Sequence, residues 1–246
     1  MTTQLTVEAR AILLDIEGTI GPASFITHDL VDYARDRFDE FIATNRQSPA
    51  VRQILSETVK RSGRQDAVAM LKDWLVRDEK VQPLKELQSL IWQHGYADGT
   101  LQGRLFADAQ SAIEIWHAER LPIYVYSSFS VKAQRLFFGH TEAGDLRHWF
   151  AGHFDTSIGA KVVARSYEKI AGEIRLRPQD VVYFADTSAE LAAAVRAGVQ
   201  VVQVAKETKS ANSRYPVIDD FSLVDIRRPA DRLGAAHFPP VGEART

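Results

Sequence analysis

Six side chains in this sequence could carry phosphate or metal chemistry, and five of them stand at or near the end of a short apolar run. They are Asp15 and Glu17 after the run that begins at Ala11, Ser127 and Ser128 after the run that ends at Tyr126, Asp186 after the run that begins at Val181, and Lys161 between the last two. Carboxylate and carbonyl oxygens suit a hard cation, and Mg²⁺ takes few protein ligands while it keeps water and a substrate phosphate. Acids for a metal ion, with Lys and Ser for a phosphate, indicate phosphoryl transfer.

Each of these residues has a simpler interpretation when it is taken alone. An acid at the end of a strand is commonly a turn former or a helix cap, two adjacent serines can satisfy a turn, and a single lysine is commonly solvated. A role as a turn former explains Asp15 less well, because Asp15 directly follows four apolar residues, where burial of an unpaired carboxylate would be costly. A bound cation or a basic partner is the better physical account of Asp15.

The elements that would position these residues alternate between strands and helices. Buried strands are predicted at residues 11–16, 121–126, 154–155, 181–185 and 200–204, and helices at residues 108–120, 131–139, 164–174 and after residue 187. This alternation predicts an α/β fold with a doubly wound, Rossmann-like parallel sheet. Ligands of such sheets bind beyond the carboxyl ends of the strands, so the six side chains are expected to meet at one edge.

Between residues 24 and 105 the pattern changes from strand to helix, because apolar residues recur at helical spacing in four successive groups. The groups are Leu30, Val31, Ala34, Phe38, Phe41 and Ile42; Val51, Ile54, Leu55, Thr58 and Val59; Val68, Leu71, Leu75 and Val76; and Leu84, Leu87, Leu90 and Ile91. We expect residues 24–105 to form a helical cap domain inserted in an α/β catalytic core of residues 1–23 and 106–228. Residues 229–246 are expected to form a poorly ordered tail.

The composition of the 246-residue chain restricts its partners and its compartment. With 45% hydrophobic and 25% charged residues, it is typical of a folded globular protein. Lys and Arg number 30 against 32 Asp and Glu, and the net charge of −2 offers no broad positive field, so nucleic acid is not an expected partner. The absence of Cys excludes disulfides and thiolate nucleophiles.

Because no apolar run suits a signal peptide or a membrane span, we expect a cytoplasmic protein without membrane association, and we expect a monomer.

Several familiar site patterns are missing from the sequence. The seven His residues lack the spacing of a helical zinc site, no glycine-rich loop carries the Lys of a P-loop, and neither G-x-G-x-x-G after the first strand nor G-x-S-x-G occurs. Thr187 and Glu190 have the spacing of a capping box. We therefore expect Thr187 to cap the helix that follows and Glu190 to bond back to it.

The chemically capable residues, taken in order, resemble the four motifs of the haloacid dehalogenase-like phosphatases. The motifs correspond to residues 15–19 (Asp-Ile-Glu-Gly-Thr), residues 126–128 (Tyr-Ser-Ser), Lys161 and Asp186. More narrowly, the sequence is similar to the enolase-phosphatase family of methionine salvage, in which Glu stands two residues after the nucleophile. Residues 83–88, 138–140, 142–146 and 154–156 extend this narrower resemblance, which runs from about Ala11 to Val204.

The resemblance implies a reaction in two parts on 2,3-diketo-5-methylthiopentyl-1-phosphate. Enolisation comes first, and hydrolysis of the phosphate then gives the acireductone 1,2-dihydroxy-3-keto-5-methylthiopentene. Asp15 would attack phosphorus and form an aspartyl phosphate, with Glu17 as a general acid or base. Mg²⁺ would be the cofactor, held by Asp15, Asp186 and the main-chain carbonyl of Glu17. Ser127, Ser128 and Lys161 would bind the phosphate of this small phosphorylated metabolite, and the helical cap would cover the site.

The sequence also departs from the family pattern. Phe129 stands where relatives usually have Gly, Val163 where many have Glu, and Ile20-Gly21 replaces a Thr-rich continuation of the first motif. If that Gly uses a positive φ angle, Phe129 must strain or reshape the phosphate loop. These departures leave open a phosphatase of the same superfamily that acts on another small phosphomonoester, and a binding protein without turnover. A dehalogenase is disfavoured because those relatives need no metal, whereas Glu17 and Asp186 are both acidic.

Overall fold

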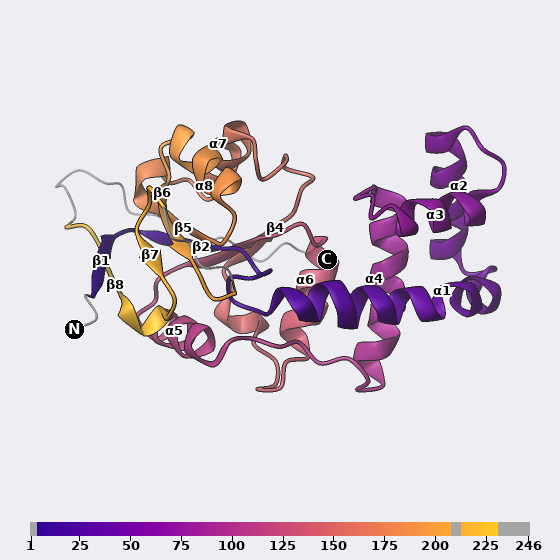
Figure 1. Ribbon diagram of the computed structural model, residues 1–246, viewed down its shortest axis with the longest axis horizontal. Coiled ribbons are helices and arrows are strands. Elements are labelled where there is room, and N and C mark those ends of the chain that lie inside the picture. Colours follow the sequence, from indigo (N-terminus) through magenta and orange to yellow (C-terminus); the bar gives the residue numbers. More distant parts are fainter. Residues whose placement is uncertain (1–3, 208–212, 231–246) are drawn as a thin grey trace, which may run out of the picture.

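A six-stranded parallel sheet organises the chain in the computed structural model, which describes residues 4–207 and 213–230 (Figure 1). Along the sheet the strands are β4 (Gly152–Phe154), β3 (Ile123–Tyr126), β2 (Ala11–Leu14), β5 (Val181–Ala185), β6 (Gln200–Val204) and β7 (Val217–Ile218). The chain enters this sheet at the central strand β2, and later strands are added outward in both directions. The predicted doubly wound α/β fold is therefore confirmed.

Alternate strand residues face two separate hydrophobic cores. Ile12 and Leu14 belong to a core with Phe184, whereas Leu13 belongs to a second core with Tyr183. Helices α5 (Ala107–Ala118) and α6 (Val131–Gly139) cover the first face, and α7 (Ala164–Glu173) and α8 (Ser188–Arg196) cover the second (Figure 1). Single 3₁₀ turns occur at Arg147–Trp149, Pro178–Asp180 and Phe221–Leu223. Because both faces are covered, the central strands β2 and β5 are buried throughout, which is why they read as continuous apolar runs.

A second, two-stranded sheet was not predicted. It pairs β1 (Leu5–Glu8) with β8 (Val224–Arg227) in parallel, so that the two ends of the described chain lie side by side. Only Val7 of β1 is buried, because the other three residues of this strand face partly or fully outward. The exposed side chains hide the strand pattern in the sequence. Residues 231–246, which include most of the predicted tail, lie outside the described residues.

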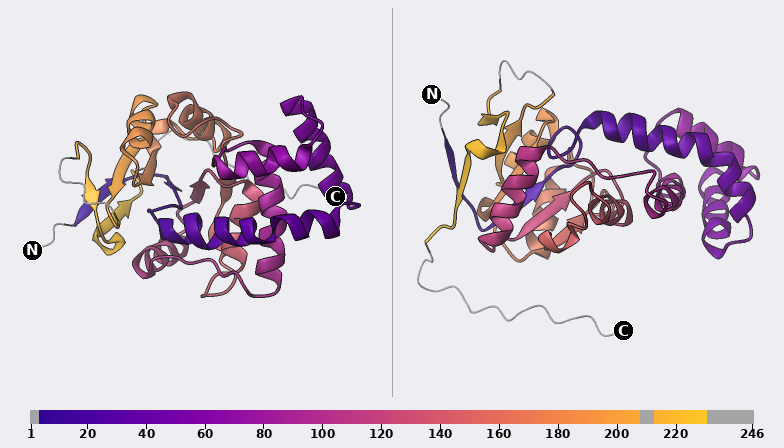
Figure 2. Two further views of the ribbon diagram at one scale, coloured as in Figure 1. Left: turned by 45° about the vertical axis from the view of Figure 1, so that its right-hand side comes forward. Right: turned by 90° about the horizontal axis from the view of Figure 1, so that it is seen from below.

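The segment between β2 and β3 is helical, as its periodicity predicts. A π-helical turn (Phe25–Leu30) leads into α1 (Val31–Asn45), which is followed by α2 (Pro49–Ser62), α3 (Ala67–Val76) and α4 (Gln82–Ala97). These helices extend from one end of the sheet, and α2 and α3 lie farthest from it (Figures 1 and 2). Val76 was predicted to lie on the buried face of α3, and this prediction is wrong. The residue is 81% exposed because it is the last residue of the helix. The boundaries of a separate cap domain at residues 24 and 105 stay a prediction.

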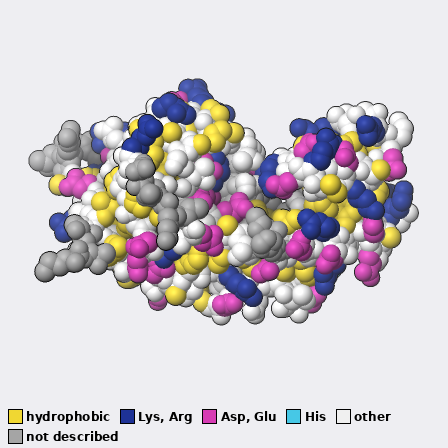
Figure 3. Space-filling model, viewed as in Figure 1, with side chains coloured by type: hydrophobic (Ala, Val, Ile, Leu, Met, Phe, Trp, Pro, Cys, Tyr) yellow, Lys and Arg dark blue, Asp and Glu magenta, His cyan; other side chains and the backbone are white. Residues whose placement is uncertain are grey.

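Helix α4 joins the helical segment to the sheet. It packs on α1, α2 and α3, and it also contacts α6. The molecular surface is hollowed between the sheet with its helices and the outer pair α2 and α3 (Figure 3). No helix in residues 4–207 or 213–230 combines the length and the apolar character that crossing a bilayer requires.

Candidate active site

The register of the sheet brings the predicted site residues to one edge. Leu14 of β2 pairs with Val125 of β3 and with Phe184 of β5, and all of these strands are parallel. The segments that continue to Asp15, to residues 127–128 and to Asp186 therefore leave the sheet at the same end. This end is the carboxyl edge, where a doubly wound sheet binds its ligand.

Lys161 lies between two buried carboxylates at this edge. Its Nζ atom is 2.6 Å from Asp15 Oδ1 and 2.8 Å from Glu190 Oε2, and the three side chains are 3% to 13% exposed. Burial raises the pKa of Asp15 to about 7, although the charge of Lys161 opposes the shift. Burial also works to lower the pKa of Lys161, but the two carboxylates outweigh it and hold that pKa above its ordinary value. The site thus keeps a fixed positive charge beside the Asp15 carboxylate.

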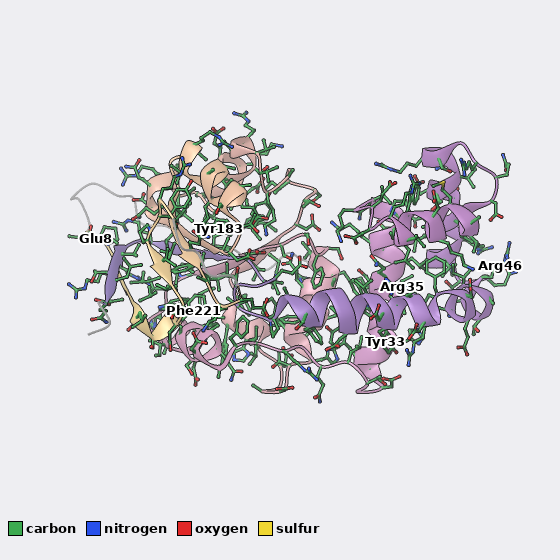
Figure 4. The ribbon with its side chains drawn as sticks, viewed as in Figure 1. Glu8, Tyr33, Arg35, Arg46, Tyr183 and Phe221 are labelled. Carbon is green, nitrogen blue, oxygen red and sulfur yellow. The ribbon has the colours of Figure 1, made fainter. Side chains whose placement is uncertain are left out.

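Three hydroxyl groups hold the loop that carries Lys161. Tyr126 donates to the carbonyl oxygen of Gly159 (2.9 Å), Ser166 to that of Ala160 (2.8 Å) and Tyr167 to that of Lys161 (2.7 Å). These are three successive carbonyl groups, and all three donors are buried. Tyr183, which lies between the sheet and the helices above it (Figure 4), donates to Glu190 Oε2 (2.8 Å). The hydroxyls therefore fix both the main chain of Lys161 and one of its ionic partners.

Removal of one of these hydroxyls should loosen Lys161 without removing its charge. We expect Tyr167→Phe to lower kcat/KM for phosphate release about tenfold, because one hydrogen bond of about 1 to 1.5 kcal/mol to the main chain of Lys161 is lost. Steady-state kinetics and thermal unfolding of the variant check this expectation. Tyr124→Phe, on the same strand as Tyr126, is the control and should leave kcat/KM within a factor of about two. A variant Tyr167→Phe with full activity would show that the loop needs no such support.

The predicted capping box at Thr187 and Glu190 is wrong. Thr187 makes no side-chain cap and instead donates to Asp186 Oδ1 (2.9 Å), while Glu190 turns inward to Lys161 and Tyr183. Sequence reasoning missed Glu190 because the capping spacing gave it a local role. The available signal was an acid on the first turn of a helix that starts at the site edge, four residues after Asp186.

The loop after β3 holds the two predicted phosphate-binding serines in different surroundings. Ser127 is fully buried and its Oγ accepts from the main-chain N–H of Phe129 (3.2 Å). Ser128 donates to Glu17 Oε2 (3.1 Å), so the structure brings the loop and the first motif together. Among the described residues other than glycine, positive φ angles occur only at Asp78, Arg120 and Arg175. Phe129 thus occupies the glycine position of the loop without the strain of a positive φ angle.

Asp186 closes the site from the side of β5. Gly18, at a φ of +64°, lies against it so closely that a Cβ atom there would be 2.7 Å from Asp186 Oδ2. Burial raises the pKa of Asp186, as is expected for a carboxylate that faces little solvent. Within the described part of the chain, no three His, Cys, Asp or Glu side chains gather as a metal-binding group. The predicted Mg²⁺ ligands Asp15 and Asp186 both follow strands that end at this edge, and carboxylate and carbonyl oxygens are the ligand types that suit Mg²⁺.

A small cavity separates helix α4 from the two loops of the site. Its volume is about 40 Å³, and its lining combines Glu17, Ser128 and Phe129 with the α4 residues Lys85 and Trp92. The rings of Trp92 and Phe129 pack with their centroids 5.5 Å apart, so the residue that replaces the family glycine contacts the helical segment. Val163, the other departure, is 47% exposed and directly precedes α7. Sequence reasoning found neither Lys85 nor Trp92 as site residues.

Comparison with known families identifies one match over most of the chain. The model of the haloacid dehalogenase-like hydrolases matches residues 9–198. A curated relative from Bradyrhizobium, named enolase-phosphatase E1, is 45% identical over 91% of this chain and 97% of its own length. The enolase-phosphatase E1 of Aquifex aeolicus is 42% identical over 88% of this chain and 99% of its own.

Solved structures give the same result for the fold. The UTR4 protein of Saccharomyces cerevisiae matches 87% of this chain and 99% of its own with a TM-score of 0.73 and 28% identity. CbbY from Rhodobacter sphaeroides, in complex with phosphate, matches 87% of this chain and 95% of its own with a TM-score of 0.55. At 16% identity this second likeness concerns the fold alone.

Proposed function

Because this chain belongs to the haloacid dehalogenase-like hydrolase family, we propose that it is the enolase-phosphatase of methionine salvage. It converts 2,3-diketo-5-methylthiopentyl-1-phosphate to the acireductone 1,2-dihydroxy-3-keto-5-methylthiopentene in two steps. The observation that carries the proposal is the ion pair of 2.6 Å between Lys161 and the buried Asp15, at the edge where both serines and Asp186 also lie. A nucleophilic carboxylate and a fixed cation are what phosphoryl transfer requires at one point.

Asp15 is the nucleophile of the hydrolytic step. Its carboxylate oxygen attacks phosphorus, the ester oxygen leaves with its electron pair and takes a proton, and an aspartyl phosphate forms. Water then attacks the same phosphorus and frees Asp15. Lys161 favours the ionised form of Asp15, whose pKa burial alone would raise further, and Ser127 and Ser128 offer hydroxyls to the phosphate oxygens. Glu17, which accepts a hydrogen bond from Ser128, would exchange protons with the substrate as a general acid or base.

The donor set at the edge fits Mg²⁺ as the resident ion. Asp15 and Asp186 would hold it through their carboxylates and Glu17 through its main-chain carbonyl, and the absence of a Cβ at Gly18 leaves room for Asp186 Oδ2. Such an ion supplies positive charge that offsets the repulsion between the carboxylates and the phosphate.

Replacement of Asp186 should weaken metal binding before it changes any other step. We expect Asp186→Asn to raise the Mg²⁺ concentration for half-maximal activity about 10- to 100-fold, because an amide oxygen replaces an anionic ligand. Titration of EDTA-treated protein with MgCl₂ measures this shift. An unchanged Mg²⁺ requirement in a folded variant would remove Asp186 from the metal site.

The small size of the cavity beneath α4 supports a motion of the helical segment α1–α4 relative to the sheet. At about 40 Å³ it is far smaller than the roughly 300 to 1,000 Å³ of ordinary ligand pockets, so the described arrangement is closed. A groove of about 410 Å³ runs beside it between α2, α4 and the start of α6, and Ser89 and Ser130 line both spaces. Their hydroxyls are 3.0 Å apart. Opening at this contact would admit the substrate, and closure would exclude water during enolisation.

A second candidate is a phosphatase of the same family that acts on another small phosphomonoester. It is motivated by Phe129, whose ring narrows the cavity against Trp92. Turnover of the diketo phosphate beside a panel of sugar phosphates and simple alkyl phosphates separates the two candidates. A kcat/KM for the diketo phosphate at least about 100-fold above the panel supports the enolase-phosphatase, and equal values support the alternative. Action as a cytoplasmic monomer, without nucleic acid or membrane partners, is part of the proposal.

A further inference from the structure

Lys85 is a buried lysine whose charge has no carboxylate partner at ion-pair distance within the described residues. It is 9% exposed, and its Nζ donates one hydrogen bond, to Thr156 Oγ1 (2.9 Å). Burial lowers the pKa of Lys85, while the nearby charge of Asp155 opposes the shift. Both oxygens of Asp155 are occupied, because they accept from the main-chain N–H groups of Val131 (3.0 Å) and Ser157 (2.8 Å). A buried cation with a single neutral acceptor is costly, which indicates that it serves a ligand.

The cavity that Lys85 lines is next to the catalytic edge, so a ligand of Lys85 would lie close to the site residues. Lys85, Ser89 and Trp92 stand at helical spacing on the face of α4 that contacts the loops of the catalytic edge. Lys85 lines the same cavity as Glu17, Ser128 and Phe129. Ser128 donates a hydrogen bond to Glu17, so a phosphate held at Ser128 would have its neighbouring carbon atoms beside the cavity that Glu17 and Lys85 both line.

We propose that Lys85 is a catalytic residue of the enolisation step, a role that rests on the proposed function. The substrate of this step is a vicinal diketone with a phosphate on the adjacent carbon. Glu17 takes a proton from that carbon, the C–H electron pair forms the new C=C bond, and the carbonyl π pair moves onto its oxygen. The Lys85 ammonium donates a hydrogen bond to this oxygen as it becomes negative. The enolate oxygen then takes a proton from water, and Glu17 returns its proton to the solvent, so the enol is an isomer of the diketone.

Lys80 provides a matched control on the same cavity. It also lines the cavity, but its Nζ is 2.6 Å from Asp78 Oδ1 and its side chain is 59% exposed. A paired and solvated ammonium stabilises an enolate far less than a buried one does. Substitution of Lys80 thus removes a positive charge from the cavity wall without removing the proposed electrophile.

The experiment measures the two steps separately in Lys85→Met, Lys80→Met and the unsubstituted protein. Solvent deuterium exchange at the carbon next to the phosphate reports enolisation, and release of phosphate from propyl phosphate, which cannot enolise, reports hydrolysis. For Lys85→Met we expect exchange to fall at least about 100-fold and hydrolysis of propyl phosphate by less than about threefold. Lys80→Met should change each rate by less than about threefold. If Lys85→Met shows no cooperative unfolding transition, the same two rates are measured in Lys85→Gln, and the same changes are expected.

Two results would overturn the role of Lys85. Unchanged exchange in the variants shows that the ammonium does not act on the enolate. An equal fall in exchange and in propyl phosphate hydrolysis shows that Lys85 only holds the cap or the phosphate. If the unsubstituted protein hydrolyses propyl phosphate but neither exchanges nor turns over the diketo phosphate, the proposed function itself fails.

Discussion

Replacement of Asp15 by Asn is expected to abolish phosphate release while the fold remains intact. The amide preserves the shape of the side chain, but its oxygen carries no negative charge with which to attack phosphorus. We expect kcat to fall about 10⁴-fold or more, as is typical when a covalent nucleophile is removed. Phosphate release from the diketo phosphate, measured at saturating Mg²⁺, gives the size of the loss.

The control for this variant is a carboxylate remote from the site. Asp225 lies on β8 and pairs with Arg227 (2.7 Å) at the surface. Asp225→Asn should leave kcat within a factor of about two. Turnover by Asp15→Asn at more than a few per cent of the normal rate would contradict the nucleophilic role of Asp15.

Replacement of Lys161 by Met is expected to damage both activity and stability. Asp15 and Glu190 would then lie buried without the cation that now stands 2.6 and 2.8 Å from them. Loss of one partner from a buried ionic group commonly costs about 3 to 5 kcal/mol of unfolding free energy. We expect kcat to fall at least about 10³-fold, because the charge that faces both the nucleophile and the phosphate is lost. Urea unfolding and phosphate release measure the two effects.

The stability loss in Lys161→Met should depend on pH in a defined direction. In the metal-free protein the folded pKa of Asp15 is about 7, well above the value of about 4 in an unfolded chain. A raised folded pKa contributes stability at low pH that is lost as the pH rises through that folded pKa. Without Lys161 the folded pKa of Asp15 rises further. The deficit of the variant relative to the unsubstituted protein, measured in EDTA, should therefore grow as the pH rises through about 7, where the unsubstituted protein has already lost the proton of Asp15.

A second lysine serves as the control for this experiment. Lys206 pairs with Asp108 (2.5 Å), is 14% exposed and lies over the ring of Phe106, so its charge is neutralised by a different carboxylate from Asp15. Lys206→Met should lower stability with little change in kcat. A deficit in Lys161→Met that shrinks with rising pH, or a variant that keeps full activity, would contradict the role assigned to Lys161.

Five strands of the central sheet were predictable, together with the edge at which the site motifs lie, because their signals are local; the short edge strand β7 was not predicted. A strand buried on both faces reads as an unbroken apolar run, and an acid at its end, such as Asp15 or Asp186, stands out against that run. Parallel strands share one carboxyl edge, so their order in the chain was enough to bring these acids together. Strand β1 lacked such a signal, since only Val7 is buried in it.

Glu190 and Lys85 could not be predicted from local pattern because their roles depend on contacts between distant segments. The spacing of Glu190 from Thr187 fits a capping box, and only the approach of Lys161 and Tyr183 turns its carboxylate inward. Lys85 lies beside the apolar stripe of α4, where a lysine is ordinarily solvated, and its burial comes from the contact with the loop at Thr156. In both cases the role of the side chain depends on a tertiary contact and could not be read from its position in the helix.

The transfer of the phosphoryl group to Asp15 is tested most directly by rapid acid quench during a single turnover of the diketo phosphate. Protein stopped within the first turnover should carry one phosphoryl group. Hydroxylamine should remove this group, as it does from an acyl phosphate, and peptide mapping should place the group on Asp15. A phosphoryl group on Ser127 or Ser128, or full phosphate release from the Asp15→Asn variant, would contradict the transfer to Asp15.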